Sequence, residues 1–410
     1  MTSGVLSGAA LKKKVQRAER KHQTMMMALM MPTLIFVGMF FVAPIGMFLF
    51  RSIDNPEVPS AFQQTLATLE SWDSREVPGE ESFRALSQDL GALVGTPQLA
   101  VLARRLNYNI AGFRRLIMGT ARKLPGDEVV SHKQFLIAAR PKWGELRYWS
   151  TIKSEGGRFT AFYLLAALDL SRAPDGSIER VPPETSLFVD LFARTFWISF
   201  MVMALCLMIG FPVARVMAAS TPKVANVLFM LILLPFWTSL LVRTTAWVIL
   251  LQHQGLVNQT LIALGILSEP IPLIFNRVGL YIAMVHVLLP FAILPIYSVL
   301  KSIPADYMRA AASLGARPWT SFRMVYLPQA MPGIIAGGAL VLVISLGYYV
   351  TPALVGGPRD QMIGYFIAHF TNRSVNWGMA SALGTLLLLT VGVLYVLLGR
   401  FVGFDRLKVR

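Results

Sequence analysis

Six long apolar runs constrain this 410-residue chain more than any other feature of its sequence. A helix needs about 20 apolar residues to cross the hydrocarbon core of a bilayer. Four of the six runs contain no Asp, Glu, Lys or Arg, and charged residues make up only 15% of the chain. The sequence therefore predicts an all-α polytopic membrane protein with six transmembrane helices. The runs cover residues 25–50, 188–214, 225–251, 279–300, 332–358 and 378–399.

The placement of the positive charge orients the predicted helices. The formal net charge is +16, and most Lys and Arg outside residues 51–186 fall on one side of the predicted spans. The short loops of the other side carry only Arg277, Arg359 and Arg373. Because cytoplasmic loops are enriched in Lys and Arg, we expect both termini, residues 1–24 and 403–410, to be cytoplasmic tails. This topology accounts for the charge, so no nucleic-acid partner is expected.

Residues 51–186 interrupt the membrane pattern. They contain 17 Lys or Arg and 16 Asp or Glu, a mixture typical of a solvated protein surface. Helical periodicity in residues 61–74, 81–94, 98–121 and 132–152 predicts a small helical insertion. Its position between the first two spans makes it periplasmic, and residues 187–402 form a core of five further spans. The insertion is either a decoration or a contact for an extracellular solute receptor.

The segment 302–333, SIPADYMRAAASLGARPWTSFRMVYLPQAMPG, lies between the fourth and fifth runs on the predicted cytoplasmic side. Pro304 favours the start of a short helix, and Gly315 suits the left-handed residue that ends one. Pro318 is expected to begin a second short helix, and the Leu327-Pro328 pair to turn the chain back towards the membrane. The sequence thus predicts a helix–turn–helix elbow, or alternatively an ordinary amphipathic connector.

This elbow resembles the cytoplasmic loop of binding-protein-dependent ABC importer permeases. The motif of that family is Glu-Ala-Ala, three residues, Gly, nine residues, Ile, any residue and Leu-Pro. Arg309 stands where the family usually has Glu. The segments 233–247, 255–261, 289–304 and 331–357 further resemble permeases of the spermidine/putrescine type. The other motif positions are filled by Ala310, Ala311, Gly315, Val325, Leu327 and Pro328.

The resemblance implies an inner-membrane permease subunit of an ABC importer for a polyamine or a related small amine. The implied partners are a second, homologous permease, two ATP-binding cassette subunits coupled through residues 302–330, and a periplasmic solute-binding protein. The chain has no Gly-x-x-x-x-Gly-Lys-[Ser/Thr] motif, so ATP and Mg are expected on the separate ATPase and no cofactor on this chain. It is therefore not expected to be an enzyme.

Other functions stay open at this point. A permease of the same family for an amino-acid derivative, a phosphonate or ferric ion is the first alternative. An ATP-independent channel or receptor is the second. A membrane-embedded enzyme is disfavoured because no catalytic motif lies near the spans, and a metal site because the single cysteine, Cys206, lies in an apolar run.

Six side chains in or near the spans are candidates for the translocation path. Aromatic faces suit a cationic solute, and ionisable groups inside spans usually face a cavity or a partner. The alternatives are that the aromatic residues only pack or anchor the interface, and that the Arg and His are paired structurally. Asp190 is the one carboxylate in the six runs, so a polycation needs acidic groups from a partner subunit. The candidates are Trp237, Arg243, Trp247, His286, Tyr348 and Tyr349.

Overall fold

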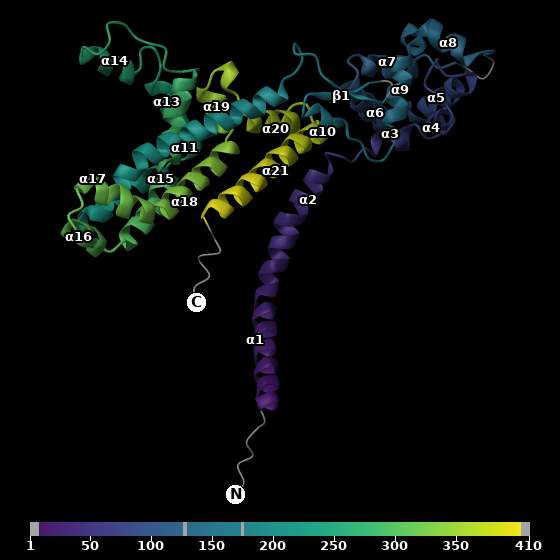
Figure 1. The fold of residues 1–410 in the computed structure, drawn as a ribbon. Helices are drawn as coiled ribbons and strands as arrows, with labels where there is room; N and C mark the ends of the chain where they lie inside the picture. The colour runs from purple at the N-terminus through teal and green to yellow at the C-terminus, as the bar shows by residue number, and fades with distance from the viewer. Residues whose placement is uncertain (1–7, 126–128, 174–175, 403–410) are drawn as a thin grey trace.

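The computed structural model describes residues 8–125, 129–173 and 176–402, and these are predominantly helical (Figure 1). Their only sheet is an antiparallel pair of short strands, β1 (Leu170–Arg172) and β2 (Ile178–Arg180). The all-α polytopic fold class is confirmed. Five helices are long and apolar enough to cross a membrane: Glu19–Phe50, Phe188–Ala219, Arg277–Ser302, Pro318–Leu346 and Trp377–Leu397.

Three of these helices form the centre of the membrane core. α11 (Phe188–Ala219), α15 (Arg277–Ser302) and α18 (Leu327–Leu346) pack against one another around buried aliphatic side chains. Gly337 allows α18 to approach α15 closely, because a Cβ there would lie 2.8 Å from the carbonyl oxygen of Ala292. α20 (Ile363–Asn372) and α21 (Trp377–Val402) pack alongside this centre.

The third run, residues 225–251, does not form a single straight helix. The chain forms α12 (Pro222–Leu233), a 3₁₀ turn η3 (Leu234–Trp237) and α13 (Leu240–Leu250), and the two halves are bent by 96°. Pro235 lies in the turn and cannot continue an α-helical hydrogen-bond ladder. Arg243 then donates hydrogen bonds to the carbonyl oxygens of Pro235 and Thr238 at the break, and the N–H of Thr238 also donates to the carbonyl of Pro235. The third run is therefore a broken span or a re-entrant segment.

The fifth run also differs from its predicted extent of residues 332–358. Its helix ends at Leu346, and α19 (Val350–Val355) follows as a separate short helix. A 3₁₀ turn, η5 (Pro358–Asp360), precedes α20, and α14 (Leu256–Ala263) lies in the loop after α13. The membrane core thus combines long spans with short helices at the end opposite the elbow (Figure 1).

The insertion has a hydrophobic core of its own. Trp143, Tyr148 and Trp149 are fully buried at its centre. Two predicted helices are each divided, since residues 98–121 break at Gly112, which has φ +92°, and residues 132–152 break at Pro141. Its helices are α3 (Glu57–Ala61), α4 (Gln63–Glu70), α5 (Glu80–Leu93), α6 (Pro97–Asn109), α7 (Phe113–Ala121), α8 (His132–Ala139), η2 (Pro141–Gly144), α9 (Leu146–Ser154) and α10 (Phe162–Ala166).

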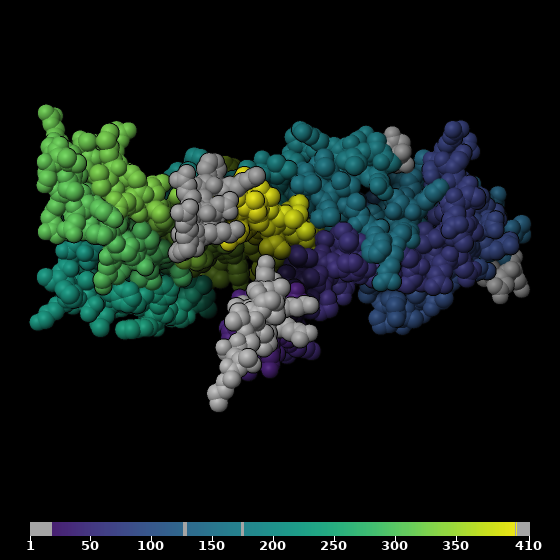
Figure 2. Space-filling model, turned by 60° about the horizontal axis from the view of Figure 1, so that its bottom comes forward, coloured from purple at the N-terminus to yellow at the C-terminus, as the bar shows by residue number. Residues whose placement is uncertain are grey.

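The insertion is closed at its neck, where the chain enters and leaves it. The backbone N–H of Thr160 donates to the carbonyl oxygen of Ile53 at 2.8 Å, and the Asn55 amide donates to the carbonyl of Glu155 at 2.7 Å. The ring of Tyr163 from α10 lies directly against Gly378 of α21. The molecule is consequently elongated, with the insertion at one end and the elbow at the other (Figure 2).

The N-terminal span stands largely apart from the bundle. α1 (Gly8–Val37), a π-helical turn η1 (Gly38–Val42) and α2 (Ala43–Phe50) form one rod, whose apolar window is 0% buried within the described chain. The Ser381 hydroxyl of α21 anchors its end by donating to the carbonyl of Leu49 at 3.1 Å. The predicted tail over residues 1–24 is therefore helical from Gly8 onwards. Residues 1–7 and the predicted tail over 403–410 lie outside the described residues.

Candidate functional site

The first limb of the elbow ends at a glycine in the left-handed conformation. α16 (Ala305–Ser313) follows Pro304, and Gly315 has φ +82°. The N–H of Ala316 donates to the carbonyl of Ala311 at 3.1 Å, and the N–H of Gly315 to that of Ala312 at 2.9 Å. This pair of bonds is the Schellman arrangement that ends many helices. Nothing lies within 4 Å of a Cβ built at Gly315, so only the backbone conformation calls for glycine there.

The second limb is continuous with the following span, and the predicted turn at Leu327-Pro328 is wrong. α17 (Pro318–Ser321) runs through a π-helical turn, η4 (Phe322–Tyr326), directly into α18. The N–H of Leu327 bonds to the carbonyl of Phe322, five residues earlier. This wider turn accommodates Pro328, whose ring and missing N–H would disturb a regular α-helical ladder. A displacement of the elbow is therefore passed to α18 without an intervening loop.

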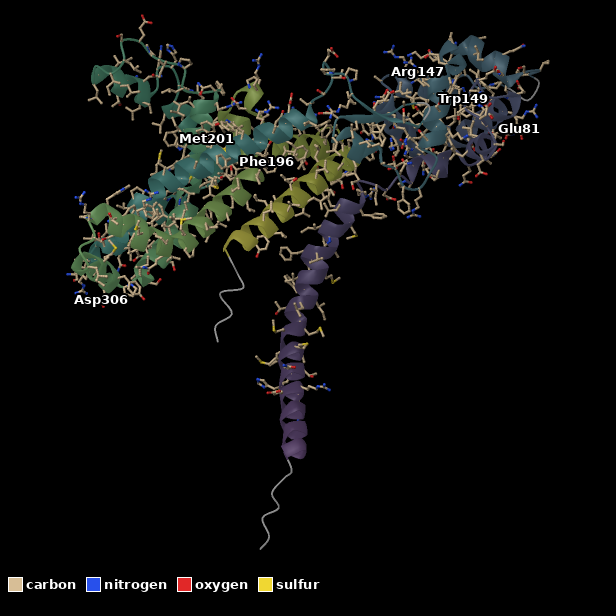
Figure 3. All side chains as sticks on the ribbon, in the orientation of Figure 1. Glu81, Arg147, Trp149, Phe196, Met201 and Asp306 are labelled. Carbon is tan, nitrogen blue, oxygen red and sulfur yellow. The ribbon has the colours of Figure 1, made fainter. Side chains whose placement is uncertain are left out.

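The elbow presents large apolar side chains that the described chain does not cover. Leu314 is 89% exposed and Trp319 is 70% exposed, and both lie at the bend. Ala310 on the first limb is exposed as well, whereas Val325 and Leu327 on the second limb are half-buried. Figure 3 shows Asp306 at the extreme tip of the core. This combination of an apolar bend and a small-residue limb fits insertion into a groove of another protein.

Arg309, at the position where the resemblance calls for Glu, is paired within its own helix. Its guanidinium lies 2.6 Å from the carboxylate of Asp306, three residues earlier. Both side chains are largely exposed, so the pair contributes little to the stability of the helix. The reversed charge at this position is therefore partly offset inside the elbow itself.

The elbow is fixed to α11 by a stack that the sequence did not reveal. The rings of Trp319, Phe322 and Tyr326 stack along the second limb, with centroids 5.6 and 5.9 Å apart. The guanidinium carbon of Arg215, in the last turns of α11, lies 4.8 Å from the Phe322 ring centre and 5.3 Å from that of Tyr326. The spacing of the three aromatic residues was the available signal, but the cation comes from about 100 residues earlier in the chain.

Two of the candidate path residues lie at the bend of the broken span. Trp237 ends η3 and is exposed. Arg243 donates to the carbonyl oxygen of Thr238 at 3.0 Å and to that of Pro235. Arg243 thus hydrogen-bonds to backbone carbonyl groups at the break of the helix. These contacts agree with the second of the two interpretations of Arg243, that it is paired structurally.

Two other candidates meet between α13 and α15. The indole N–H of Trp247 donates to Nδ1 of His286 at 3.1 Å. One turn earlier, the hydroxyl of Thr244 lies 3.4 Å from that of Thr351 in α19. These contacts form a polar seam among α13, α15 and α19, at the end of the core opposite the elbow.

The two tyrosines of the candidate set lie between α18 and α19, and they differ in their surroundings. Tyr348 packs against the buried cluster shared by α11 and α15, whereas Tyr349 precedes α19 and is exposed. The structure therefore brings Trp247 and His286 into contact and leaves Trp237 and Tyr349 on the surface of the isolated chain.

Residues 207–404 match the family described as "Binding-protein-dependent transport system inner membrane component". The matched region contains the elbow and the polar seam and excludes the insertion. A permease protein PotB of a spermidine/putrescine transport system, from Haemophilus influenzae, is 38% identical over 48% of this chain and 71% of its own length. The protein of the same name from Escherichia coli strain K12 is 31% identical over 52% of this chain and 78% of its own length.

A solved structure of a bacterial alginate ABC transporter, in complex with an alginate pentasaccharide-bound periplasmic protein, also aligns with the chain. It is 19% identical, covers 54% of this chain and 80% of the other, and has a TM-score of 0.43. The apolar helices and the sequence relatives agree on a multi-pass inner-membrane protein. The chain belongs to the family of binding-protein-dependent ABC importer permeases and is of the spermidine/putrescine type.

Proposed function

We propose that this permease imports a polyamine or a related small amine together with a second, homologous permease subunit. Two ATP-binding cassette subunits hold ATP and Mg and bind the elbow on the cytoplasmic side, where both termini also lie. A periplasmic solute-binding protein delivers the solute at the opposite end. The observation that carries the proposal is the exposed apolar elbow with its left-handed Gly315, joined without a loop to a span.

The packing of the core indicates how a displacement of the elbow is passed on to the other helices. When the ATPase subunits close on ATP they displace the elbow, and the continuous helix from Pro318 to Leu346 moves with it. Gly333 and Gly337 seat this helix against the backbone of α15, which in turn packs on α11. Interiors packed this closely move as rigid bodies rather than deforming, so the three helices change their tilt together. ATP hydrolysis then resets the cycle.

The polar seam is compatible with a solute that carries amine groups, although it offers no negatively charged side chain to that solute. The Trp247 indole and its His286 partner offer an aromatic face and hydrogen-bonding groups between α13 and α15. Aromatic faces attract cations. The second permease then supplies carboxylates along the path, since Asp190 is the one carboxylate in the six apolar runs of this chain. The alternative solutes within the family are an amino-acid derivative, a phosphonate or ferric ion.

Substitution at Gly315 tests the coupling role. In Gly315→Val a β-branched residue is forced to a positive φ, which distorts the bend, whereas Gly315→Asn tolerates that conformation. We expect Gly315→Val to lose most solute uptake in reconstituted vesicles while the ATPase subunits still hydrolyse ATP, and Gly315→Asn to retain uptake. Wild-type uptake by the valine variant would contradict the coupling role.

The solute itself is tested by uptake into vesicles that contain the complete transporter and its binding protein. Radiolabelled putrescine and spermidine are compared with a phosphonate, an amino-acid derivative and ferric ion. ATP-dependent accumulation of the polyamines alone is the expected result. Accumulation of one of the other solutes instead would leave the importer assignment intact and replace the solute.

A further inference from the structure

The charges of the insertion are segregated between its two halves. Residues 90–144 contain nine Lys or Arg, and their only acidic residues are Asp127 and Glu128, which lie outside the described residues. By contrast, eight Asp or Glu occur in residues 54–89. The insertion as a whole is nearly neutral, so this separation was hidden in its net charge. It gives α6, α7 and η2 a strongly basic character.

Four of these cations converge on one stripe of α7. Residues 112, 115, 119 and 122 fall on the same side of a helix by their spacing of three and four. Arg115 and Arg122 belong to this stripe and are exposed. The guanidinium of Arg140 lies directly over Gly119, with its Cζ 2.6 Å from a Cβ built there, and Nζ of Lys142 lies 3.6 Å from one built at Gly112.

Gly119 and Gly112 therefore leave room on α7 for Arg140 and Lys142, the two cations that come from the α8–η2 segment. Any side chain at position 119 would displace the Arg140 guanidinium from α7. The stripe from residue 112 to 122 is about 15 Å long at the rise of an α-helix. Arg115, Arg122, Arg140 and Lys142 thus form one cluster, which we call the α7 basic stripe.

The α7 basic stripe is not neutralised within the described chain. None of its four cations forms an ion pair there, although Arg105, Arg147 and Arg158 of the same insertion do. The Nε atom of Arg140 is buried without a hydrogen-bond partner in the described residues. Like charges at this spacing repel one another, and an unsatisfied buried donor costs stability. An anionic partner removes both penalties.

We propose that the α7 basic stripe is the docking surface for an acidic face of the periplasmic solute-binding protein. The inference rests on the proposed function, because a binding protein for a cationic solute needs carboxylates to pair with the charges of that solute. Oppositely charged faces speed encounter and fix the orientation of the complex. The same stripe repels the free cationic solute, so solute reaches the core only when it is delivered by its carrier.

The position of the stripe favours a protein over a lipid surface. In Figure 1, α7 and α8 lie at the top of the insertion, whereas α2 and the N-terminal span leave from its lower side. The insertion packs on the ends of α20 and α21 through α10, so the stripe is held at a fixed place relative to the core. A docked protein can therefore reach from α7 towards the polar seam.

The test measures how the solute-binding protein stimulates the ATPase activity of the complete transporter in nanodiscs. The probe is the solute-loaded binding protein that supports uptake in the vesicle assay above. In Arg115→Glu/Lys142→Glu, we expect the half-maximal concentration of that protein to rise at least about tenfold. Basal ATPase activity and the maximal stimulation should stay unchanged, since both substituted side chains are exposed.

Two matched variants control for charge and for folding. Arg115→Lys/Lys142→Arg keeps the charge and should behave as wild type. Arg75→Glu/Arg84→Glu makes the same change in net charge at exposed positions of the acidic half and should have little effect. The half-maximal concentration for wild type should also rise with NaCl.

An unchanged half-maximal concentration in Arg115→Glu/Lys142→Glu overturns the inference, as does an equal rise in Arg75→Glu/Arg84→Glu. An effect seen only in nanodiscs with phosphatidylglycerol, and absent in phosphatidylcholine alone, assigns the stripe to anionic lipid and also overturns it. Failure of the binding protein to stimulate the wild-type transporter at all contradicts the proposed function instead.

Discussion

Single residues decide how firmly the elbow is attached to the rest of the core. The guanidinium of Arg215 covers both the Phe322 and Tyr326 rings, and its planar shape allows it to stack on them. A cation–π contact at an exposed site is worth about 0.5–1 kcal/mol. This energy is small compared with the stability of the fold, but the contact lies where the elbow meets α11 and therefore where a movement of the elbow is passed to that helix.

Arg215→Gln is expected to lower the amount of solute imported per ATP hydrolysed, because the elbow can then move without carrying α11 along. Arg215→Lys should retain part of the wild-type coupling, since the lysine ammonium keeps the positive charge but lacks the planar shape that stacks on the rings. The measurement is simultaneous uptake and ATP hydrolysis in vesicles. Lys223→Gln, an exposed cation at the start of α12, is the matched control and should leave the ratio unchanged. An unaltered ratio in Arg215→Gln would remove the stack from the coupling route.

Glu80 ties two helices of the insertion together through its carboxylate. Burial by itself would raise the pKa of Glu80, but hydrogen bonds from the Ser131 hydroxyl and from the N–H groups of Lys133 and His132 lower that pKa below 4.5. A carboxyl whose pKa is lowered by folding stabilises the folded state at pH values above its ordinary pKa. That contribution is lost as the pH falls through 4.5 and below.

Glu80→Gln should therefore lower the melting temperature of the full chain in detergent at pH 7. The difference from wild type should shrink as the pH falls below 4.5, since the wild-type carboxyl then becomes protonated and comes to resemble the amide. Glu81→Gln, at the exposed neighbouring position, serves as control and should have no effect at either pH. A difference that is constant with pH would show that the charge of Glu80 is not what stabilises the fold.

At the scale of helices, close packing of α18 on α15 depends on glycine. A Cβ at Gly337 would meet the Ala292 carbonyl oxygen at 2.8 Å, and backbone atoms cannot move aside as a flexible side chain can. The spacing of Gly333 and Gly337 is one that permits close approach of two helices. The partner helix and the carbonyl that it presents became known only from the packed core.

Gly337→Ala is expected to destabilise the core by about 1–3 kcal/mol through overpacking, despite the better helix propensity of alanine. Gly392→Ala in α21 is the matched control, because nothing lies within 4 Å of a Cβ built there, and it should be neutral or slightly stabilising. Thermal unfolding of the purified full-length variants compares the two. Equal melting temperatures would show that α15 and α18 are not in contact at this point.

For the molecule as a whole, a buried ion pair fixes the insertion at its neck. Arg105 and Glu155 are paired at 2.6 Å, with side chains only 3% and 8% exposed. Asn55 and Thr160, from the two chain segments of the neck, bond to the same pair. The guanidinium of Arg105 also lies 4.8 Å from the Tyr163 ring, which packs on α21. The ion pair and the contacts around it therefore fix the orientation of the insertion relative to the spans.

Glu155→Ala should cost roughly 3–5 kcal/mol, because it leaves the Arg105 charge buried and unpaired. Arg105→Met/Glu155→Leu should recover part of that loss, since it removes both charges. Hydrogen exchange of the full chain should show loss of protection at the neck and in α10 for Glu155→Ala. Retained protection there would mean that other contacts orient the insertion.

The sequence by itself determined the membrane class, the helical insertion and the place of the elbow. These features depend on local properties: the length of an apolar run, the period of a helix and the left-handed conformation that Gly315 adopts. Even so, local rules were wrong at Leu327-Pro328, because a proline that follows a π-helical turn does not end the helix.

Only the tertiary structure decided which parts act together. The bend of the third span, the Arg215 stack, the Trp247–His286 contact and the α7 basic stripe each need the position of groups that local spacing does not give. The stripe joins two segments of the insertion through Gly112 and Gly119, and the stack joins residues about 100 positions apart. Such contacts depend on how finished helices pack, and no local pattern of the sequence carries that information.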